Sequence, residues 1–359
     1  MRLLLGALVL FAAAACGSTD GVAAPTTTSA PPATTATATT IMTPPSTTPP
    51  TTTTLPAGCG SAVEAGTTTI EIGTPDGLTR SATQHVPTGY DPDAATPLVL
   101  SFHGFGFSGP AHHVSTGLTA VADRETFIVV TPQGSVAPVF QQTFWNTESP
   151  QPPAGLEGEL VDDVGFTELL IDDLSSRLCI DVDRVHATGL SNGGFFSSRL
   201  ACDLSSRIAS VATVAGVFDP PGCAQDRAVP ILTIHGTGDP VVPFDASPSN
   251  LGDVLALDDD AVFALLVGQR EPVPQIIDRW AAANGCAIEV ITTEISDTVE
   301  RRDYEGCDAA TAFVIVTGGG HTWPGTPAQF EAIVGTTDQT FRASDMIWDW
   351  FAGHPRVVA

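Results

Sequence analysis

Apolar runs of strand length alternate with stretches of helical periodicity along most of the chain. The runs that predict buried strands are 97–104, 127–130, 185–190, 208–217, 229–234 and 312–317. Helices are predicted at 117–125, 164–178 and 195–204, and apolar residues recur at helical spacing within 164–178. Buried strands that alternate with helices form a mostly parallel sheet with helices on both faces, so the predicted fold class is α/β.

Two further pairs of strands are predicted to be antiparallel. Residues 67–72 and 78–86 flank the turn at 74–77, and 287–291 with 298–304 form an excursion later in the chain. Between 245 and 274 the alternation breaks, with only a possible helix at 261–268. We interpret 245–274 as a surface insertion, which is either a lid over an active site or a loop without that role.

The N-terminal segment has the pattern of an export signal. Arg2 is followed by an apolar run too short to span a membrane and by small residues, which predicts a signal peptide at 1–15. The position of Cys16 resembles a bacterial lipoprotein cleavage site and predicts lipidation of Cys16, unless the cysteine is incidental to ordinary cleavage. Residues 16–57 are rich in Thr and Pro and predict a disordered stalk, which leaves a folded domain at 58–355. The domain is therefore expected outside the cell, anchored to the membrane surface.

Charge and composition exclude several classes of function. The 359 residues carry a formal net charge of −26, and all 14 basic residues are arginine. An acidic surface repels nucleic acid, so no nucleic-acid partner is expected. A chain without lysine has neither a Walker-type phosphate loop nor a Schiff-base lysine. We predict no cofactor and a monomeric chain.

A serine lies at the centre of the strongest motif. Ser191 is flanked by Gly189 and Gly193 in the pattern Gly-x-Ser-x-Gly, with an apolar strand before it and a helix after it. This context is typical of a nucleophile elbow, in which a tight turn exposes the serine hydroxyl above the sheet. Ser191 is therefore the predicted nucleophile.

A serine nucleophile needs a base that is oriented by an acid, and in such folds the chain order is serine, acid, histidine. His321 follows the last buried strand in a glycine-rich loop and is the predicted base. Asp239 follows the strand 229–234 and is the preferred acid, with Asp219 as the alternative. The earlier pair at 162–163 opens a helix, where carboxylates commonly cap.

The oxyanion of the tetrahedral intermediate that a serine nucleophile forms needs two hydrogen-bond donors. In this arrangement they are the backbone N–H groups of the residue after the nucleophile and of the loop after an earlier strand. That reasoning nominates Asn192 and Phe105. His103, Trp145 and Trp323 are candidates for the substrate pocket.

Six cysteines remain besides Cys16, and an even number in an exported chain indicates disulfides. Without further constraint, some of them could instead be buried free thiols. No Cys-x-x-Cys or paired Cys/His spacing occurs, so no metal site is predicted. The predicted pairs are Cys286–Cys307, Cys202–Cys223 and Cys59–Cys179.

Four motifs in order resemble those of the polyhydroxybutyrate depolymerase-like esterases, a family that also takes in feruloyl and acetylxylan esterases and actinobacterial lipoprotein esterases. They are FHGFG at 102–106, GLSNGG at 189–194, HGTGDPVVP at 235–243 and GHTWPG at 320–325. The resemblance implies an α/β-hydrolase fold, secretion, no metal, and hydrolysis of carboxylic esters by Ser191, Asp239 and His321. The insertion at 245–274 is longer than the family pattern, which leaves the shape of the substrate mouth open.

Three functional hypotheses follow. The first is a cell-surface serine esterase acting on a hydroxyalkanoate ester, a feruloyl or acetyl ester of a polysaccharide, or a lipid. The second is a surface binding protein on a hydrolase scaffold without activity, and the third is a serine peptidase. The complete set of nucleophile, base and acid argues against the second hypothesis, and the resemblance of the surrounding motifs to those of esterases argues against the third.

Overall fold

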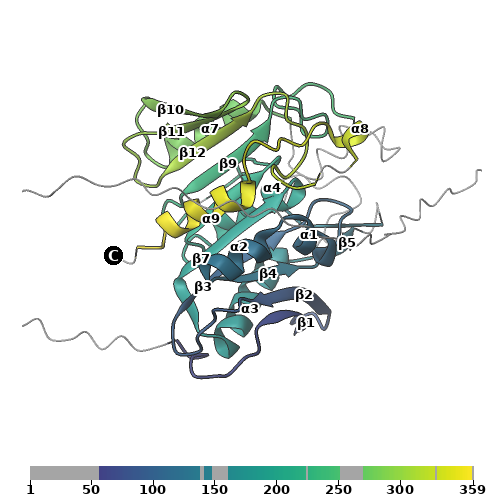
Figure 1. Cartoon of the computed structure of the whole chain (residues 1–359), viewed down its shortest axis with the longest axis vertical. Coiled ribbons are helices and arrows are strands. Elements are labelled where there is room, and N and C mark those ends of the chain that lie inside the picture. The colour runs from purple at the N-terminus through teal and green to yellow at the C-terminus, as the bar shows by residue number, and fades with distance from the viewer. Residues whose placement is uncertain are drawn as a thin grey trace, which may run out of the picture. The chain divides into compact units, whose positions relative to one another are not determined.

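A ten-stranded sheet runs through the part of the chain that the computed structural model describes (Figure 1). The described residues are 56–137, 141–147, 161–223, 225–250, 270–327 and 330–357. In spatial order the strands are β1 (Gly66–Gly73), β2 (Thr79–Val86), β4 (Ile128–Pro132), β3 (Thr96–Phe102), β7 (Ile180–Leu190), β8 (Ser210–Val214), β9 (Ile231–Gly236), β12 (Thr311–Val316), β11 (Val299–Tyr304) and β10 (Val290–Ser296). A separate hairpin pairs β5 (Ser135–Ala137) with β6 (Gln142–Phe144).

The centre of the sheet is parallel and its two edges are antiparallel. Strands β4, β3, β7, β8, β9 and β12 pair parallel with one another in this order, whereas β4 pairs antiparallel with β2 and β12 pairs antiparallel with β11. Side chains of one strand alternate between two cores, so that Leu98 and Leu100 pack on one face and Val99 on the other. Burial on both faces explains why these strands appear in the sequence as continuous apolar runs.

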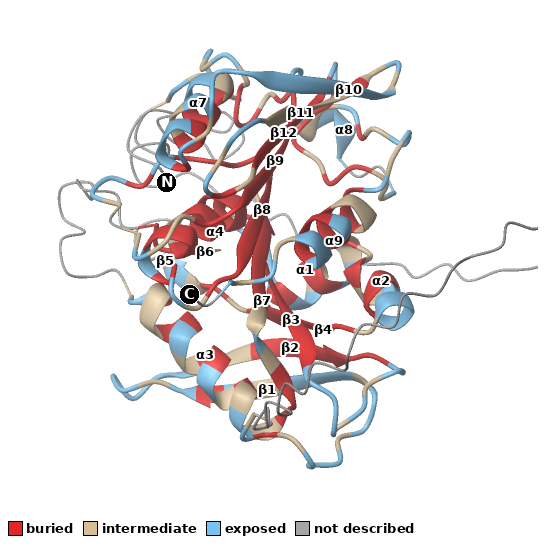
Figure 2. Ribbon diagram, turned by 90° about the vertical axis from the view of Figure 1, so that its left-hand side faces the viewer, coloured by how far each residue is buried: buried red, intermediate tan, exposed pale blue. Residues whose placement is uncertain are grey.

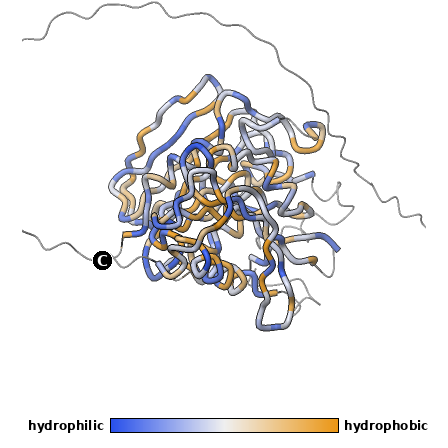
Figure 3. Tube along the Cα trace, turned by 60° about the horizontal axis from the view of Figure 1, so that its bottom comes forward, coloured by the Kyte–Doolittle hydropathy of each residue, from blue (hydrophilic) through white to orange (hydrophobic). Residues whose placement is uncertain are grey.

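Helices cover both faces of the sheet, and the central strands between them are buried (Figure 2). One face carries α3 (Asp163–Arg177), α4 (Asn192–Asp203) and α7 (Val273–Ala283). The other carries α1 (Gly109–Ser115), α2 (Leu118–Glu125) and α9 (Ala343–Gly353), and a short helix α8 (Glu331–Val334) precedes α9. Buried hydrophobic side chains of the sheet and the helices form the two main cores. Figure 3 shows the hydropathy of each residue along the trace. The predicted α/β-hydrolase fold with a mostly parallel sheet and two helical layers is confirmed.

The predicted antiparallel pairs are present as β1–β2 and β10–β11. The helices α2, α3 and α4 lie within two or three residues of their predicted bounds. The sequence pattern did not predict α1, α7, α9 or the β5–β6 hairpin. Predictions for residues 1–55, including the signal, Cys16 and most of the stalk, lie outside the described residues, as does the larger part of the 245–274 insertion.

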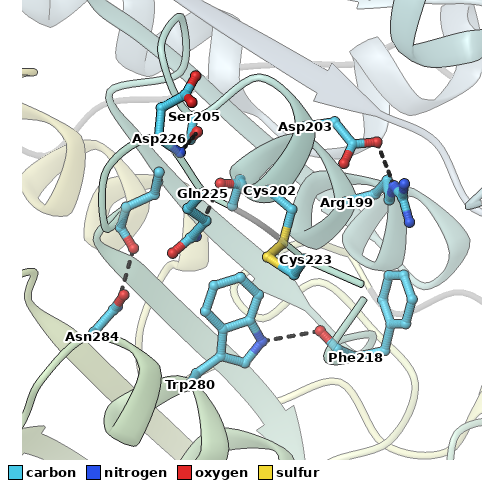
Figure 4. Close-up of a disulfide and its surroundings, with 12 residues drawn as sticks. Arg199, Cys202, Asp203, Ser205, Phe218, Cys223, Gln225, Asp226, Trp280 and Asn284 are labelled. Carbon is cyan, nitrogen blue, oxygen red and sulfur yellow. Dashed lines mark hydrogen bonds and ion pairs between the residues drawn. A yellow bond between two sulfur atoms is a disulfide. The ribbon is translucent and has the colours of Figure 1, made fainter. Parts of the chain in front are cut away.

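Three disulfides join the elements, and their pairs are those predicted. Cys59–Cys179 ties the start of the described chain to the residue before β7, with Cα atoms 4.1 Å apart. Cys202–Cys223 links the end of α4 to the segment after β8 at 5.3 Å (Figure 4). Cys286–Cys307 closes the β10–β11 excursion at 3.7 Å.

Within the described ranges, no helix is both long enough and apolar enough to cross a membrane. In the same ranges no group of three or more His, Cys, Asp or Glu side chains could hold a metal ion.

Candidate active site

Ser191 lies at the sharp turn between β7 and α4. Its φ of 56° and ψ of −122° are rare for a residue with a side chain. A Cβ atom at Gly189 would lie 2.4 Å from the carbonyl of Gly193, and one at Gly193 would lie 2.1 Å from the carbonyl oxygen of Phe102. Backbone crowding therefore requires glycine on both sides of the serine, which is the physical basis of the motif.

Asp239 and His321 form a buried pair beyond the ends of neighbouring parallel strands. Asp239 follows β9 and His321 follows β12, and the Nδ1 atom of His321 lies 2.8 Å from the Oδ2 atom of Asp239. The other carboxylate oxygen accepts the backbone N–H groups of Val241 and Val242, each at 2.8 Å. These two bonds fix the carboxylate with Oδ2 directed at the imidazole.

A small apolar cluster connects the serine turn with this pair. We call it the elbow cluster; its members are Phe105, Phe195, Phe218, Val241, Val242 and Val334. The N–H of Phe195 donates to the carbonyl of Ser191 at 2.9 Å, and the carbonyl of Val334 accepts the N–H of His321 at 2.5 Å. The cluster thus packs backbone neighbours of the serine, the acid and the histidine together at the carboxyl edge of the sheet, where α/β folds bind ligands.

The other carboxylates considered from the sequence have different partners. Asp219 is exposed and pairs with Arg279 at 3.0 Å. Asp162 caps α3 by accepting a backbone N–H, as its place before a helix predicts. Asp163 is buried and pairs with Arg80 at 2.5 Å. Of the aspartates weighed as the acid, Asp239 is the one bonded to His321.

His235 is a member of the site that sequence reasoning missed. Its Nε2 atom donates to the carbonyl of Val242 at 2.8 Å and lies 3.5 Å from Oδ2 of Asp239. Burial lowers the pKa of His235, so its ring is neutral near pH 7. The signal that could have found it is its position four residues before the acid, at the start of the HGTGDPVVP motif.

The loop after β3 lies against the serine. A Cβ atom at Gly104 would be 3.4 Å from the Cβ atom of Ser191. Phe105 is the next residue in the chain after this contact. Asn192 is the first residue of α4, where backbone N–H groups have no acceptor within the helix. The two backbone segments nominated for the oxyanion hole therefore flank Ser191.

The three pocket candidates are buried side chains, and their place in the substrate pocket stays a prediction. His103 and Trp145 are fully buried and Trp323 is 5% exposed. His103 accepts the N–H of Gly134 at 2.9 Å, and the Trp145 ring stacks on Phe196. The indole of Trp323 donates to a buried serine hydroxyl of α9 at 2.9 Å.

Comparison with known proteins identifies relatives among the esterases. Over 273 residues the chain is 29% identical to the Nocardia uniformis subsp. tsuyamanensis protein named "Putative esterase NocK", covering 72% of this chain and 74% of that protein. It is 28% identical to feruloyl esterase B of Piromyces equi, covering 66% of this chain but only 41% of that relative's length. Acetyl xylan esterase from Aspergillus awamori shares the fold, with a TM-score of 0.50 at 13% identity over 79% of this chain and 99% of that structure. No protein-family model matches the chain.

The fold and the serine elbow define an α/β-hydrolase of the serine hydrolase class. Within that class the chain is similar in sequence to carboxylic ester hydrolases, the group in which its named relatives fall. The family resemblance drawn from the four sequence motifs is thereby confirmed at the level of esterase and fold.

Proposed function

We propose that the chain hydrolyses carboxylic esters with Ser191 as nucleophile, His321 as general base and Asp239 as the acid that orients the histidine. The observation that carries this proposal is the 2.8 Å bond between His321 and Asp239 beside a strained serine turn. His321 would take the proton of the Ser191 hydroxyl as the oxygen attacks the ester carbonyl, and return it to the leaving alcohol. Water, activated by the same histidine, then releases the acid from the acyl-enzyme.

In this mechanism the backbone N–H groups of Phe105 and Asn192 stabilise the oxyanion. The proposal is supported by the approach of Gly104 to Ser191 and by the place of Asn192 at the positive end of α4. Neutral Asp239 would lose its attraction for the imidazolium, so activity requires the ionised carboxylate.

For the substrate we propose a feruloyl or acetyl ester carried by a polysaccharide. The names of the relatives, feruloyl esterase B and acetyl xylan esterase, support this class. Phe105 and Val334, the partly buried members of the elbow cluster, pack against its buried core next to the acid and the base and are suited to contact the acyl part of such an ester. A hydroxybutyrate ester is the second candidate, and it is favoured by the resemblance of the four motifs to polyhydroxybutyrate depolymerase-like esterases.

We further propose that the protein is exported and held at the cell surface through lipid on Cys16. Three disulfides support export, because such bonds persist in oxidising compartments. Replacing Cys16 by Ala tests the anchor: the variant should leave the membrane fraction or remain unprocessed. A variant that is processed and stays in the membrane fraction contradicts lipidation at this cysteine.

Active-site labelling with a fluorophosphonate tests the nucleophile. Wild type should be labelled and Ser191→Ala should not. Ser198→Ala is the matched control, because its hydroxyl bonds a carbonyl within the same helix and should not affect labelling. Initial rates on methyl ferulate, p-nitrophenyl acetate and a methyl ester of 3-hydroxybutyrate trimer then rank the substrate classes. Labelling of Ser191→Ala would contradict the assignment of the nucleophile.

A further inference from the structure

Trp145 bonds to both backbone segments that carry the proposed oxyanion donors. Its indole N–H donates to the carbonyl of His103 at 3.0 Å, one residue before Gly104 and two before Phe105. Its backbone N–H donates to Oδ1 of Asn192 at 2.7 Å, and its carbonyl accepts Nδ2 of the same side chain at 3.0 Å. One residue therefore links the loop after β3 to the start of α4.

The link is buried and geometrically specific. Neither Trp145 nor Asn192 is exposed to solvent. The paired bonds from one amide side chain to the backbone N–H and the carbonyl of a single residue need a donor and an acceptor on that side chain, which asparagine supplies. The indole ring packs edge-on against Phe102 and stacks on Phe196, the rings of β3 and α4 that flank the turn.

Contacts on its far side hold Trp145 in place. The next residue, Asn146, donates its backbone N–H to Oδ2 of Asp163 at 2.7 Å. Asp163 is bonded in turn to Arg80, whose guanidinium lies 5.6 Å from the centre of the Trp145 ring. Trp145 is thus anchored from outside the serine turn, and this anchoring lets it act as a rigid spacer between the two segments.

We propose that Trp145 and the Asn192 side chain act as a brace that sets the spacing between the backbone N–H groups of Phe105 and Asn192. Both are positioning residues, since they act through those N–H groups and not on the substrate. The inference rests on the proposed serine esterase mechanism. Oxyanion donors act by being preorganised within hydrogen-bond distance of the transition state, and removing one donor costs about 10²–10³-fold in kcat. A change that displaces both N–H donors without removing either of them should lower kcat by a smaller factor.

The test compares Asn192→Ala with Asn284→Ala. Asn284 is a fully buried asparagine at the end of α7 that also bonds backbone, donating to the carbonyl of Val229 at 3.1 Å (Figure 4). With p-nitrophenyl acetate, Asn192→Ala should lower kcat by about 10–100-fold with KM within about twofold. Its inhibition constant for a trifluoromethyl ketone, whose adduct carries the oxyanion, should rise in parallel. Asn284→Ala should lower the melting temperature and leave kcat and the inhibition constant unchanged.

Trp145→Phe is the second variant, which keeps ring packing and removes the indole N–H. As in Asn192→Ala, kcat should fall and the inhibition constant should rise, each by a smaller factor. If Asn192→Ala does not fold, Trp145→Phe alone tests the brace. Unchanged values in Trp145→Phe and in any folded Asn192→Ala overturn the brace while Ser191→Ala remains inactive. Activity that survives in Ser191→Ala instead overturns the proposed function, and the brace with it.

Discussion

Asp239 and His321 meet because the strands before them are register partners. Gly236 and Val316, the last residues of β9 and β12, lie opposite each other in the parallel ladder. Each strand is followed by a short turn, and the two side chains then bond at 2.8 Å. The sheet register, rather than the reach of flexible side chains, sets the geometry of the pair.

Replacing Asp239 by Asn should nearly abolish esterase activity. The amide keeps the shape but loses the charge that orients and stabilises the imidazolium, and the corresponding change in a Ser-His-Asp triad lowers kcat by about 10⁴-fold. Initial rates on p-nitrophenyl acetate measure the effect. Asp219→Asn is the control, expected within about twofold of wild type because Asp219 pairs with exposed Arg279 and its loss is a surface change. The opposite ranking would transfer the role of acid to Asp219.

Replacing His235 by Phe should impair both stability and turnover. The change leaves the carbonyl of Val242 without its buried donor, which costs about 1–3 kcal/mol in the free energy of unfolding. The turn that donates two N–H groups to Asp239 loses its support, so kcat should also fall. His112→Phe is the control: His112 is equally buried but bonds Ser101, away from the acid. Urea unfolding and kcat separate the two variants, and equal kcat values would contradict a role for His235 in positioning the acid.

The sequence predicted the sheet, the serine turn and the acid–base pair because each leaves a local pattern. Strands buried on both faces are continuously apolar, and the serine turn needs glycine at position 189 because a Cβ atom there would lie 2.4 Å from the carbonyl of Gly193. Helix α1 left no such pattern. It contains Gly, Pro and two histidines, and its stability comes from bonds to strands, such as that of His113 to Thr131 at 2.9 Å. The burial of Trp145 likewise depends on segments far apart in the chain, which periodicity does not reveal.

Gly189→Ala should destabilise the fold strongly, whereas Gly73→Ala should not. A methyl group at position 189 meets the backbone of Gly193 at 2.4 Å, and neither segment can move without disturbing the serine turn. The expected cost is at least about 1–3 kcal/mol in the free energy of unfolding. A Cβ atom at Gly73 in β1 meets nothing within 4 Å, so that control should stay within about 0.5 kcal/mol. Similar urea midpoints for the two variants would contradict the crowding argument.

Loss of the Cys59–Cys179 disulfide should destabilise the protein more than loss of Cys286–Cys307. The first pair is separated by 120 residues and the second by 21. In the chain-entropy model a longer closed loop restricts the unfolded state more, giving about 5 against about 3 kcal/mol. Urea unfolding of the two double Cys→Ser variants measures the difference. A larger loss for the shorter loop would show that native-state contacts outweigh loop entropy here.

Buried histidines should make the protein less stable in acid. Burial lowers the pKa of His103 to about 4 and that of His112 to about 3, from 6.5 for an exposed ring. Between pH 6.5 and 4 the unfolded chain therefore binds protons at these sites that the folded chain does not. The contribution of these neutral histidines to the free energy of unfolding is complete above pH 6.5. It falls as the pH drops toward their pKa values in the folded protein. Asp163 acts in the opposite sense, since burial raises its pKa to about 6.

His103 and His112 should together contribute a slope of about 2.5 kcal/mol per pH unit near pH 5. Burial also lowers the pKa of His113, His186 and His235, so these rings add to the slope, which the opposing carboxylate of Asp163 reduces but does not cancel. Urea unfolding at pH 7 and pH 5 measures the change. His112→Gln removes one of the two groups and should lower the slope by about 1.4 kcal/mol per pH unit, while His354→Gln, at the partly exposed end of α9, should lower it less. A slope that His112→Gln leaves unchanged would mean that other groups govern the acid transition.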